Sequence, residues 1–175
     1  QVYVNDAFGT LHRAHASTVG MVKHFQEKGI GFLVKKEVDY LEKVLEEPAR
    51  PLVAIMGGAK VADKLGVVDH LLTKVDALLI GGAMAYTFLK AAGVRVGKSL
   101  VEESQLRMAA RFIEKAKLRG VPLLLPIDHR VVTEVESQDY DSVEGNIPED
   151  RMGVDIGPKT LQLFYSKISE AKTII

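Results

Sequence analysis

Short apolar runs and helical periodicity alternate along the chain after residue 50. A short continuous apolar run is typical of a buried strand, whereas apolar residues three and four positions apart are typical of one helix face. Strands that alternate with helices favour a parallel sheet covered on both faces. The pattern predicts strands at 52–56, 76–80, 121–126 and 173–175, and helices over 60–72, 83–92, 99–119 and 158–171.

Glycine, proline and capping residues predict where these helices begin and end. Ser99 and Glu102 have the spacing of a capping box that opens the helix up to residue 119. Gly93 and Gly120 are expected to end helices. A glycine followed by Pro158 is expected to begin the last one.

Before residue 50 the pattern is different. A strand-like run, "VYV", precedes the polar stretch "NDAFGTLHRAHAS", and a long amphipathic helix follows over 33–46. Two prolines in "EEPARP" are expected to end that helix. The predicted fold class is therefore α/β: a three-layer α/β/α sandwich with a mostly parallel, Rossmann-like sheet, joined by a long helix to a remnant of a second α/β domain.

Both ends of the chain lie in strand-like apolar runs, "VYV" and "TII". Natural domains rarely begin and end inside strands. We therefore expect the 175 residues to be a segment of a longer protein. The polar, acidic stretch 133–152 is expected to be an exposed excursion.

Composition excludes several classes of protein. The 23 basic and 23 acidic residues cancel, which argues against a general nucleic-acid binder. There are no cysteines, so disulfides and thiolate metal sites are impossible, as suits a reducing cytoplasm. No apolar run approaches the roughly 20 residues that span a bilayer, and no signal peptide is visible.

The stretch "GGAKVADK", residues 57–64, combines bare backbone with two lysines after a predicted strand. Open α/β sheets bind ligands at the carboxyl ends of their strands, and free amides at a helix start favour an anion. In a helix from about residue 59, Lys60 and Lys64 would lie one turn apart on one face, where a polyanion could bridge them. A tight turn with two solvated lysines, partly neutralised by Asp63, is equally compatible with the pattern.

Two other glycine-rich stretches are less specific. "IGGAMAYTF" (80–88) repeats the order strand, glycine pair, helix, and close helix–strand packing explains it as well as a nucleotide surface does. "GVRVGKS" (93–99) resembles a P-loop, but only three residues separate its glycines and it follows a predicted helix. We interpret it as a helix end and a cap. No G-x-G-x-x-G fingerprint occurs.

His12, Arg13 and His15 follow the first strand. An arginine fork suits phosphate or carboxylate, although a loop arginine paired with Asp6 would leave the same pattern. Two histidines could be half of a metal site, but no further ligands are evident, so no metal site is expected. The other histidines are assigned no role, and no Ser-His-Asp set or acid/base carboxylate pair is evident.

Three motifs occurring in this order closely resemble phosphoglycerate kinases: "YVNDAFGTLHRAHAS", "GGAKVADKLGV" and "LIGGAMAYTFLK". "GFLVKKEVDYLEKVLEEPARP" resembles that family's interdomain helix, and "MGVDIGPKT" another of its segments. The resemblance covers essentially the whole chain and a little under half of the family's length. It implies that 1–32 end the phosphoglycerate domain, 33–50 form the interdomain helix and hinge, and 51–175 begin the nucleotide-binding domain.

The resemblance also implies a function. The family is a cytoplasmic glycolytic phosphotransferase with a carboxyl-group acceptor, a hinge-bending monomer that moves a phosphoryl group between 1,3-bisphosphoglycerate and Mg²⁺-ADP to give 3-phosphoglycerate and ATP. Arg13 would grip the phosphoglycerate, with His12 and His15 in the same basic patch. Lys60 would follow the transferring phosphoryl group, and Lys64 would hold the nucleotide phosphates. Gly58, Ala59, Gly81 and Gly82 would line the nucleotide pocket.

The chain departs from the family at Ala83, where a third glycine is common, and at Arg151, where a tryptophan is common. Most of the family's substrate arginines would lie upstream and its second phosphate loop downstream, so the isolated chain is expected to be inactive. The alternatives are a catalytically inactive nucleotide-binding fragment and, remotely, an NAD-dependent oxidoreductase, which lacks its glycine fingerprint here.

Overall fold

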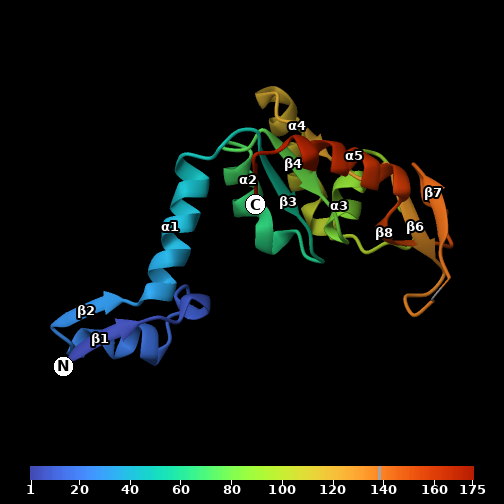
Figure 1. Cartoon of the computed structure of the whole chain (residues 1–175). Helices are drawn as coiled ribbons and strands as arrows, with labels where there is room; N and C mark the ends of the chain where they lie inside the picture. Colours follow the sequence, from blue (N-terminus) through green and yellow to red (C-terminus); the bar gives the residue numbers. More distant parts are fainter. Residues whose placement is uncertain (138) are drawn as a thin grey trace. The chain divides into compact units, whose positions relative to one another are not determined.

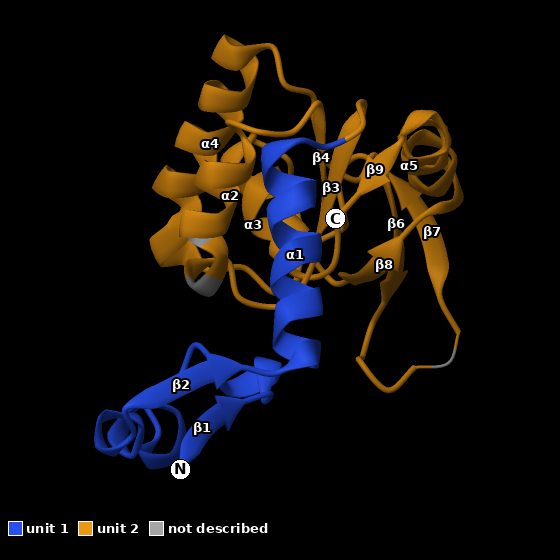
Figure 2. Ribbon diagram, turned by 60° about the vertical axis from the view of Figure 1, so that its left-hand side comes forward, with its two compact units in different colours: residues 1–48 blue, residues 49–175 orange. Residues whose placement is uncertain are grey.

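The computed structural model describes residues 1–137 and 139–175, with every side chain in these ranges except those of Asp63 and Leu65. The chain divides into two compact units, residues 1–48 and 49–175, shown in blue and orange in Figure 2. The division falls inside the predicted connector 33–50. The roles of the two parts as substrate and nucleotide domains stay predictions.

Unit 1 is built on a pair of parallel strands, β1 (Val2–Asn5) and β2 (Glu27–Ile30). Short helical turns connect them: η1 (Phe8–Thr10), η2 (Ala16–Gly20) and η3 (Val22–His24). The long helix α1 (Phe32–Glu46) follows and ends before the first of the two prolines, as predicted.

Asp6, which directly follows β1, caps α1. Its Oδ1 accepts a hydrogen bond from the backbone N–H of Val34 (2.9 Å), an amide in the first turn that has no partner within the helix. Among the ion pairs of the described residues, none joins Asp6 to Arg13. The structure therefore gives this carboxylate a capping role in place of the suggested arginine pair.

The main sheet of unit 2 is parallel throughout and confirms the α/β fold class. Its order is β5 (Leu123–Leu124), β4 (Ala77–Ile80), β3 (Leu52–Met56) and β9 (Thr173–Ile174). Each predicted strand is present, although the first and last in this order are shorter than predicted. Figure 1 shows β3 and β4 inside the unit with helices around them.

The two faces of this sheet are covered by different helices, because side chains alternate along a strand. Leu52, Ala54 and Met56 of β3 pack in one apolar cluster with residues of α2 (Leu65–Leu71), α3 (Met84–Ala91) and α4 (Leu106–Arg119). Val53 of β3 packs in another cluster with Phe164 of α5 (Pro158–Glu170). This is the three-layer arrangement that the sequence predicts.

Two helices begin later than predicted. The region 60–72 opens with a short turn, η4 (Ala62–Lys64), before α2, and 99–119 opens with η5 (Glu103–Gln105) before α4. The predicted capping box is wrong: the buried Ser99 Oγ accepts from the N–H of Gly153 (2.9 Å), and Glu102 bonds elsewhere. The C-terminal signal is confirmed, because Gly120 ends α4 in the left-handed conformation (φ 67°).

A second sheet of unit 2 was not predicted. The strands β6 (Asp128–Val132), β7 (Asp141–Glu144) and β8 (Met152–Ile156) pair antiparallel around the central β6. Part of the predicted excursion 133–152 is therefore a strand, though most of its described residues are exposed as expected. Short strands with few apolar residues leave little periodic signal.

Asp128 and His129 are the buried polar residues of β6. Asp128 caps α5: its carboxylate accepts the N–H groups of Lys159 (2.9 Å) and Thr160 (2.7 Å). Burial alone would raise the pKa of Asp128, but these bonds and that from the Thr160 hydroxyl outweigh it and lower the pKa. Burial has the opposite effect on a base, and it lowers the pKa of His129. The negative charge of Asp128 raises that pKa by a smaller amount.

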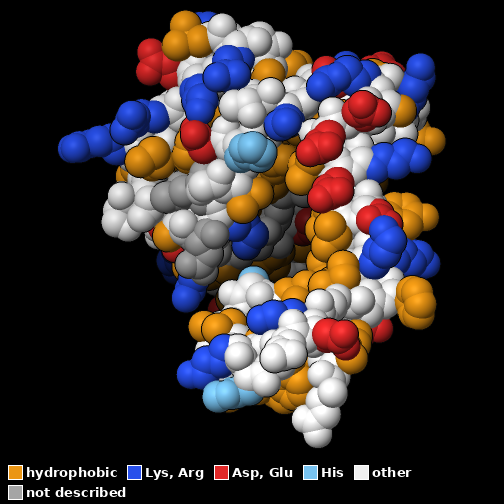
Figure 3. Space-filling model, turned by 90° about the vertical axis from the view of Figure 1, so that its left-hand side faces the viewer, with side chains coloured by type: hydrophobic (Ala, Val, Ile, Leu, Met, Phe, Trp, Pro, Cys, Tyr) orange, Lys and Arg blue, Asp and Glu red, His pale blue; other side chains and the backbone are white. Residues whose placement is uncertain are grey.

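Within the described residues, no helix is long and apolar enough to cross a bilayer. The face drawn in Figure 3 carries Lys and Arg side chains among Asp and Glu side chains rather than a single field of one sign. This mixture agrees with the zero net charge of the chain.

Candidate functional site

The candidate site of unit 2 starts where β3 ends. Residues 57–64, here called the lysine loop, follow Met56 directly and lead into α2. Gly58 has φ 136°, a backbone conformation that residues with a side chain rarely adopt. Its carbonyl accepts the N–H of Met84 (2.8 Å), which begins α3. The loop is thus anchored to the helix that follows the neighbouring strand.

The second glycine pair contacts the lysine loop. Gly81 follows β4, and its N–H donates to the carbonyl of Met56 (2.8 Å). A Cβ on Gly82 would lie 2.8 Å from the backbone nitrogen of Gly58, and Gly82 also has a positive φ of 63°. A side chain here would separate the two segments. Close backbone packing therefore explains this pair, whether or not a nucleotide also lies over it.

Ala83 does not disturb this arrangement. It precedes α3 with right-handed helical backbone angles (φ −63°, ψ −28°), which any L-residue adopts. The backbone therefore needs no third glycine at this position. Any effect of the departure from the common family pattern is confined to the added methyl group.

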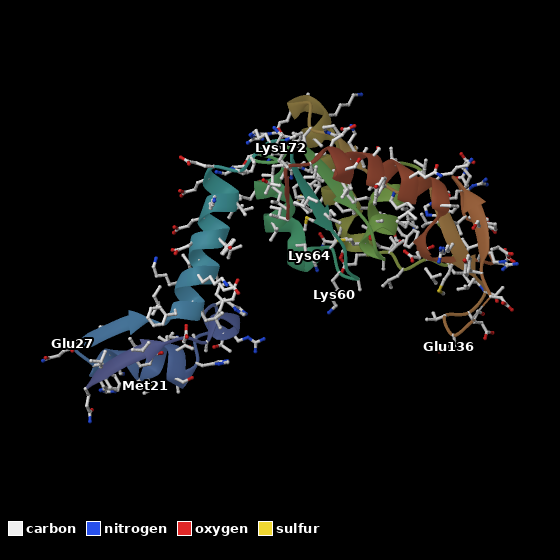
Figure 4. The ribbon with its side chains drawn as sticks, viewed as in Figure 1. Met21, Glu27, Lys60, Lys64, Glu136 and Lys172 are labelled. Carbon is white, nitrogen blue, oxygen red and sulfur yellow. The ribbon has the colours of Figure 1, made fainter. Side chains whose placement is uncertain are left out.

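The two lysines do not share a helix face, so that part of the prediction is wrong. Lys60 is exposed and lies before η4, in non-helical backbone, whereas Lys64 is half-buried and ends η4. The Nζ of Lys64 lies 2.9 Å from the point where a Cβ on Gly58 would stand, so its ammonium folds back over the glycines. Figure 4 labels both lysines on the segment between β3 and α2. The partner suggested for them, Asp63, has a side chain outside the described residues.

This geometry suits a polyphosphate better than a single anion. The ammonium of Lys64 lies close to the bare backbone at the carboxyl end of a central strand, and that of Lys60 is exposed to solvent. The first group can bind one phosphate, and the second can reach another phosphate of the same ligand. Because α2 is short, the start of this helix contributes less to anion binding than the sequence suggested.

The candidate anion-binding residues of unit 1 lie between η1 and η2. His12, Arg13 and His15 are all exposed, and the Arg13 Nε donates to the His12 Nε2 over 3.4 Å. His15 stands at the start of η2, and its backbone N–H donates to the hydroxyl of Thr18 (3.1 Å). The structure therefore brings Arg13 and His12 together and leaves the guanidinium exposed to solvent.

The P-loop-like segment 93–99 is a structural turn, as interpreted from the sequence. Its amides donate inward: Val94 to the carbonyl of Leu89 (3.0 Å) and Lys98 to that of Arg151 (2.8 Å). A Cβ on Gly97 would lie 2.2 Å from the carbonyl oxygen of Pro148, so packing requires this glycine. The segment provides no cradle for a phosphate.

Two open grooves, of about 540 and 510 Å³, lie elsewhere in unit 2, and neither is lined by Lys60 or Lys64. The larger runs beside Met108, Arg111 and Lys115 of α4. Among the side chains that the structure describes, which leave out residue 138, Asp63 and Leu65, no group of three or more His, Asp or Glu residues is arranged to hold a metal ion.

Comparison with known proteins gives a consistent family. The family model described as "Phosphoglycerate kinase" matches residues 1–175. The chain is 57% identical over 175 residues to the phosphoglycerate kinase of Anaeromyxobacter sp. (strain K), covering 99% of this chain and 44% of that protein. It is 52% identical over 176 residues to that of Clostridium novyi, again covering 44% of that protein.

The same holds for solved structures. The phosphoglycerate kinase from Coxiella burnetii superposes with a TM-score of 0.90 at 41% identity, covering 99% of this chain and 45% of that one. The chain thus spans less than half the length of the relatives that it matches.

Proposed function

The chain belongs to the phosphoglycerate kinase family, and we propose that it is the central part of an enzyme that transfers a phosphoryl group between 1,3-bisphosphoglycerate and Mg²⁺-ADP. The products would be 3-phosphoglycerate and ATP. The observation that carries the proposal is the lysine loop, in which the half-buried Lys64 lies with its ammonium over Gly58 and the exposed Lys60 stands beside it after β3.

In this proposal unit 2 binds the nucleotide. Gly58, Ala59, Gly81 and Gly82 line the surface on which the nucleotide lies, since their missing or small side chains let it approach the backbone. Lys64 holds the nucleotide phosphates, because its ammonium is already folded over Gly58. Mg²⁺ enters with the nucleotide as part of the substrate, and the protein needs no resident metal site.

Unit 1 supplies part of the phosphoglycerate site. The Arg13 guanidinium offers a planar fork that matches a phosphate or carboxylate, and its contact with His12 orients it. His15 adds to the same basic patch. Further groups of the complete protein would finish this site.

The chemical step needs little covalent help from the protein. The bond between the phosphorus and the acyl oxygen of 1,3-bisphosphoglycerate breaks, and a bond from a terminal oxygen of the ADP β-phosphate to that phosphorus forms. Catalysis is then positioning, and positive charge on the equatorial oxygens in the transition state. The exposed Lys60 is suited to that charge, because its long side chain can follow the phosphoryl group between the two oxygens.

The short coverage supports a second candidate for the isolated chain. Because it spans 44% of its relatives, it lacks the groups that would complete either substrate site, and on its own it would bind Mg²⁺-ADP without catalysing transfer. Two measurements on the 175-residue chain distinguish these candidates: calorimetry with Mg²⁺-ADP, and an assay for ATP with 1,3-bisphosphoglycerate added. Weak binding without ATP formation is expected, and measurable turnover would contradict this candidate.

The test of the full proposal is an assay of the complete protein. We expect the complete protein to be a cytoplasmic monomer that forms ATP from 1,3-bisphosphoglycerate and Mg²⁺-ADP. Arg13→Ala should raise the KM for 3-phosphoglycerate in the reverse reaction roughly tenfold or more, because a charged hydrogen bond contributes about 1.5–3 kcal/mol. Lys23→Ala, which removes another exposed cation of unit 1, should leave that KM unchanged. An unaltered KM in Arg13→Ala would remove Arg13 from the site.

A further inference from the structure

We propose that Glu102 is a positioning residue that holds the lysine loop in its active geometry, an inference that rests on the function proposed above. The partners of the Glu102 carboxylate are 40 or more residues away in the sequence, and Glu102 was predicted only to cap its own helix. It instead bonds to the backbone that directly follows Lys60.

The contact is a double one. A single carboxylate oxygen, Glu102 Oε2, accepts the backbone N–H groups of both Val61 (2.7 Å) and Ala62 (3.0 Å). Hydrogen bonds from amides to an ionised carboxylate are stronger than neutral ones. Glu102 is half-buried and Val61 is fully buried in the main core, so solvent competes weakly for the bond to Val61, whereas Ala62 is exposed.

Glu102 is itself bonded to α3, the helix that follows the second glycine pair. Its backbone N–H donates to the hydroxyl of Thr87 (3.1 Å), a buried residue of α3, the helix that follows Gly81 and Gly82. The carbonyl of Gly58 accepts from the first residue of the same helix. One residue therefore joins the start of η4 to the helix beside the other half of the candidate nucleotide surface.

The two lysines depend on this contact to different degrees. Lys64 also has helical support, since its N–H donates to the carbonyl of Val61 (2.9 Å) and it ends η4. Lys60 lies in non-helical backbone directly before the two amides that Glu102 binds. Loss of the carboxylate should therefore displace Lys60 more than Lys64, and affect turnover more than nucleotide affinity.

The neighbouring Glu103 is a matched control. It has the same charge, stands at the next position and is exposed. Its Oε1 is paired with the Nζ of Lys90, near the end of α3 that is distant in sequence from Gly81 and Gly82. It makes no hydrogen bond to the lysine loop among the described residues. A general effect of losing a carboxylate in this region would appear in both positions, whereas positioning of Lys60 would appear only at Glu102.

The experiment measures kcat and the KM for Mg²⁺-ADP in the complete kinase. Glu102→Ala should lower kcat roughly ten- to a hundredfold, since a displacement of about 1 Å can cost that much, with KM changed less than about threefold. Glu102→Gln retains an oxygen that can accept both N–H groups and should keep most of the turnover. Glu103→Ala should match the wild type. If Glu102→Ala does not fold, Glu102→Asp, whose shorter side chain cannot reach both amides, takes its place.

A double mutant shows whether Glu102 acts through Lys60. In a Lys60→Ala background, Glu102→Ala should lower kcat less than about twofold, because the group that it positions is already gone. An equal loss in both backgrounds would overturn the inference, as would a wild-type kcat in Glu102→Ala.

Amide hydrogen exchange separates this inference from the proposed function. Val61 and Ala62 should exchange faster in Glu102→Ala and at the wild-type rate in Glu103→Ala. If Lys60→Ala leaves kcat unchanged, the role proposed for Lys60 is wrong, and the inference falls with it even if exchange changes. If Lys60→Ala is slow but exchange and kcat are normal in Glu102→Ala, only the inference about Glu102 is wrong.

Discussion

The lysine loop and the segment 93–99 both contain two glycines and basic residues, but they occupy different positions in the fold. The lysine loop follows the central strand β3 of a parallel sheet, and the segment 93–99 follows the helix α3. Gly97 is required by two carbonyl oxygens that leave no room for a Cβ, whereas the nearest atoms to a Cβ on Gly58 belong to the flexible end of Lys64. Glycines and basic residues alone therefore do not predict a phosphate-binding loop, and the position of the segment in the sheet is the better guide.

The largest expected effect concerns the exposed lysines of the two segments. Lys60→Ala should lower the kcat of the complete kinase about a hundred- to a thousandfold, because one lost transition-state charge costs about 2.7–4 kcal/mol. Lys98→Ala, an exposed lysine of the other segment, should change kcat less than twofold. Steady-state kinetics on both variants is the measurement, and a fall of less than tenfold in Lys60→Ala would remove it from the chemical step.

The glycines of the segment 93–99 should matter for stability. Gly97→Ala should reduce the free energy of unfolding by about 1–3 kcal/mol or more, because the added methyl group meets two carbonyl oxygens. Gly93→Ala is the matched control: its φ is also positive, but a Cβ there has no atom within 4 Å, so only about 1 kcal/mol is expected. Urea unfolding followed by circular dichroism measures both, and equal losses would show that strain, not packing, dominates.

A smaller effect, on the KM for Mg²⁺-ADP, should distinguish Lys64 of the lysine loop from Arg95 of the segment 93–99. Lys64→Ala should raise the KM for Mg²⁺-ADP roughly tenfold with little change in kcat, since it removes one charged contact to a bound phosphate. Arg95→Ala removes an exposed cation that lines the 510 Å³ groove and should leave KM unchanged. Equal KM values in the two variants would contradict the assignment of Lys64.

The smallest effect concerns the second sheet, which packs against the segment 93–99 through Val96 and Val131. Burial lowers the pKa of His129, so the unfolded chain binds a proton more readily than the folded one. The free energy of unfolding should therefore be highest above pH 6.5, the ordinary pKa of histidine, and fall as the pH drops below it.

Unfolding of the chain at pH 5 and pH 8 checks this sign. His129→Phe should flatten the difference, because the neutral ring has no proton to gain, whereas the exposed His70→Phe should retain it. Asp128 contributes in a separate, more acidic pH range. Because its pKa is lowered in the folded chain, it stabilises the fold above the ordinary pKa of an aspartate, and this stabilisation is lost as the pH falls further. Identical pH profiles in all three proteins would refute the assignment to His129.

Local pattern determined much of this protein. The alternation of strands and helices in 51–175 and the order of the two glycine pairs could be read from the sequence. So could the helix ends near Gly93 and Gly120 and the helix start at Pro158. Each depends on neighbours a few positions apart, where periodicity and backbone preference act directly. The motifs that indicate the family are of the same local kind.

Tertiary structure decided what depends on distant partners. Glu102 has the spacing of a capping residue for its own helix, but its carboxylate binds amides about 40 positions away, because the fold brings two unpaired N–H groups within its reach. Lys60 and Lys64 do not share a helix face, because the short turn η4 stands where the sequence predicted the first turn of a helix. The sheet of β6, β7 and β8 likewise forms from short segments whose pairing comes from non-local hydrogen bonds. A carboxylate can satisfy any donor that it reaches, so its partner is set by the folded chain and not by its neighbours in sequence.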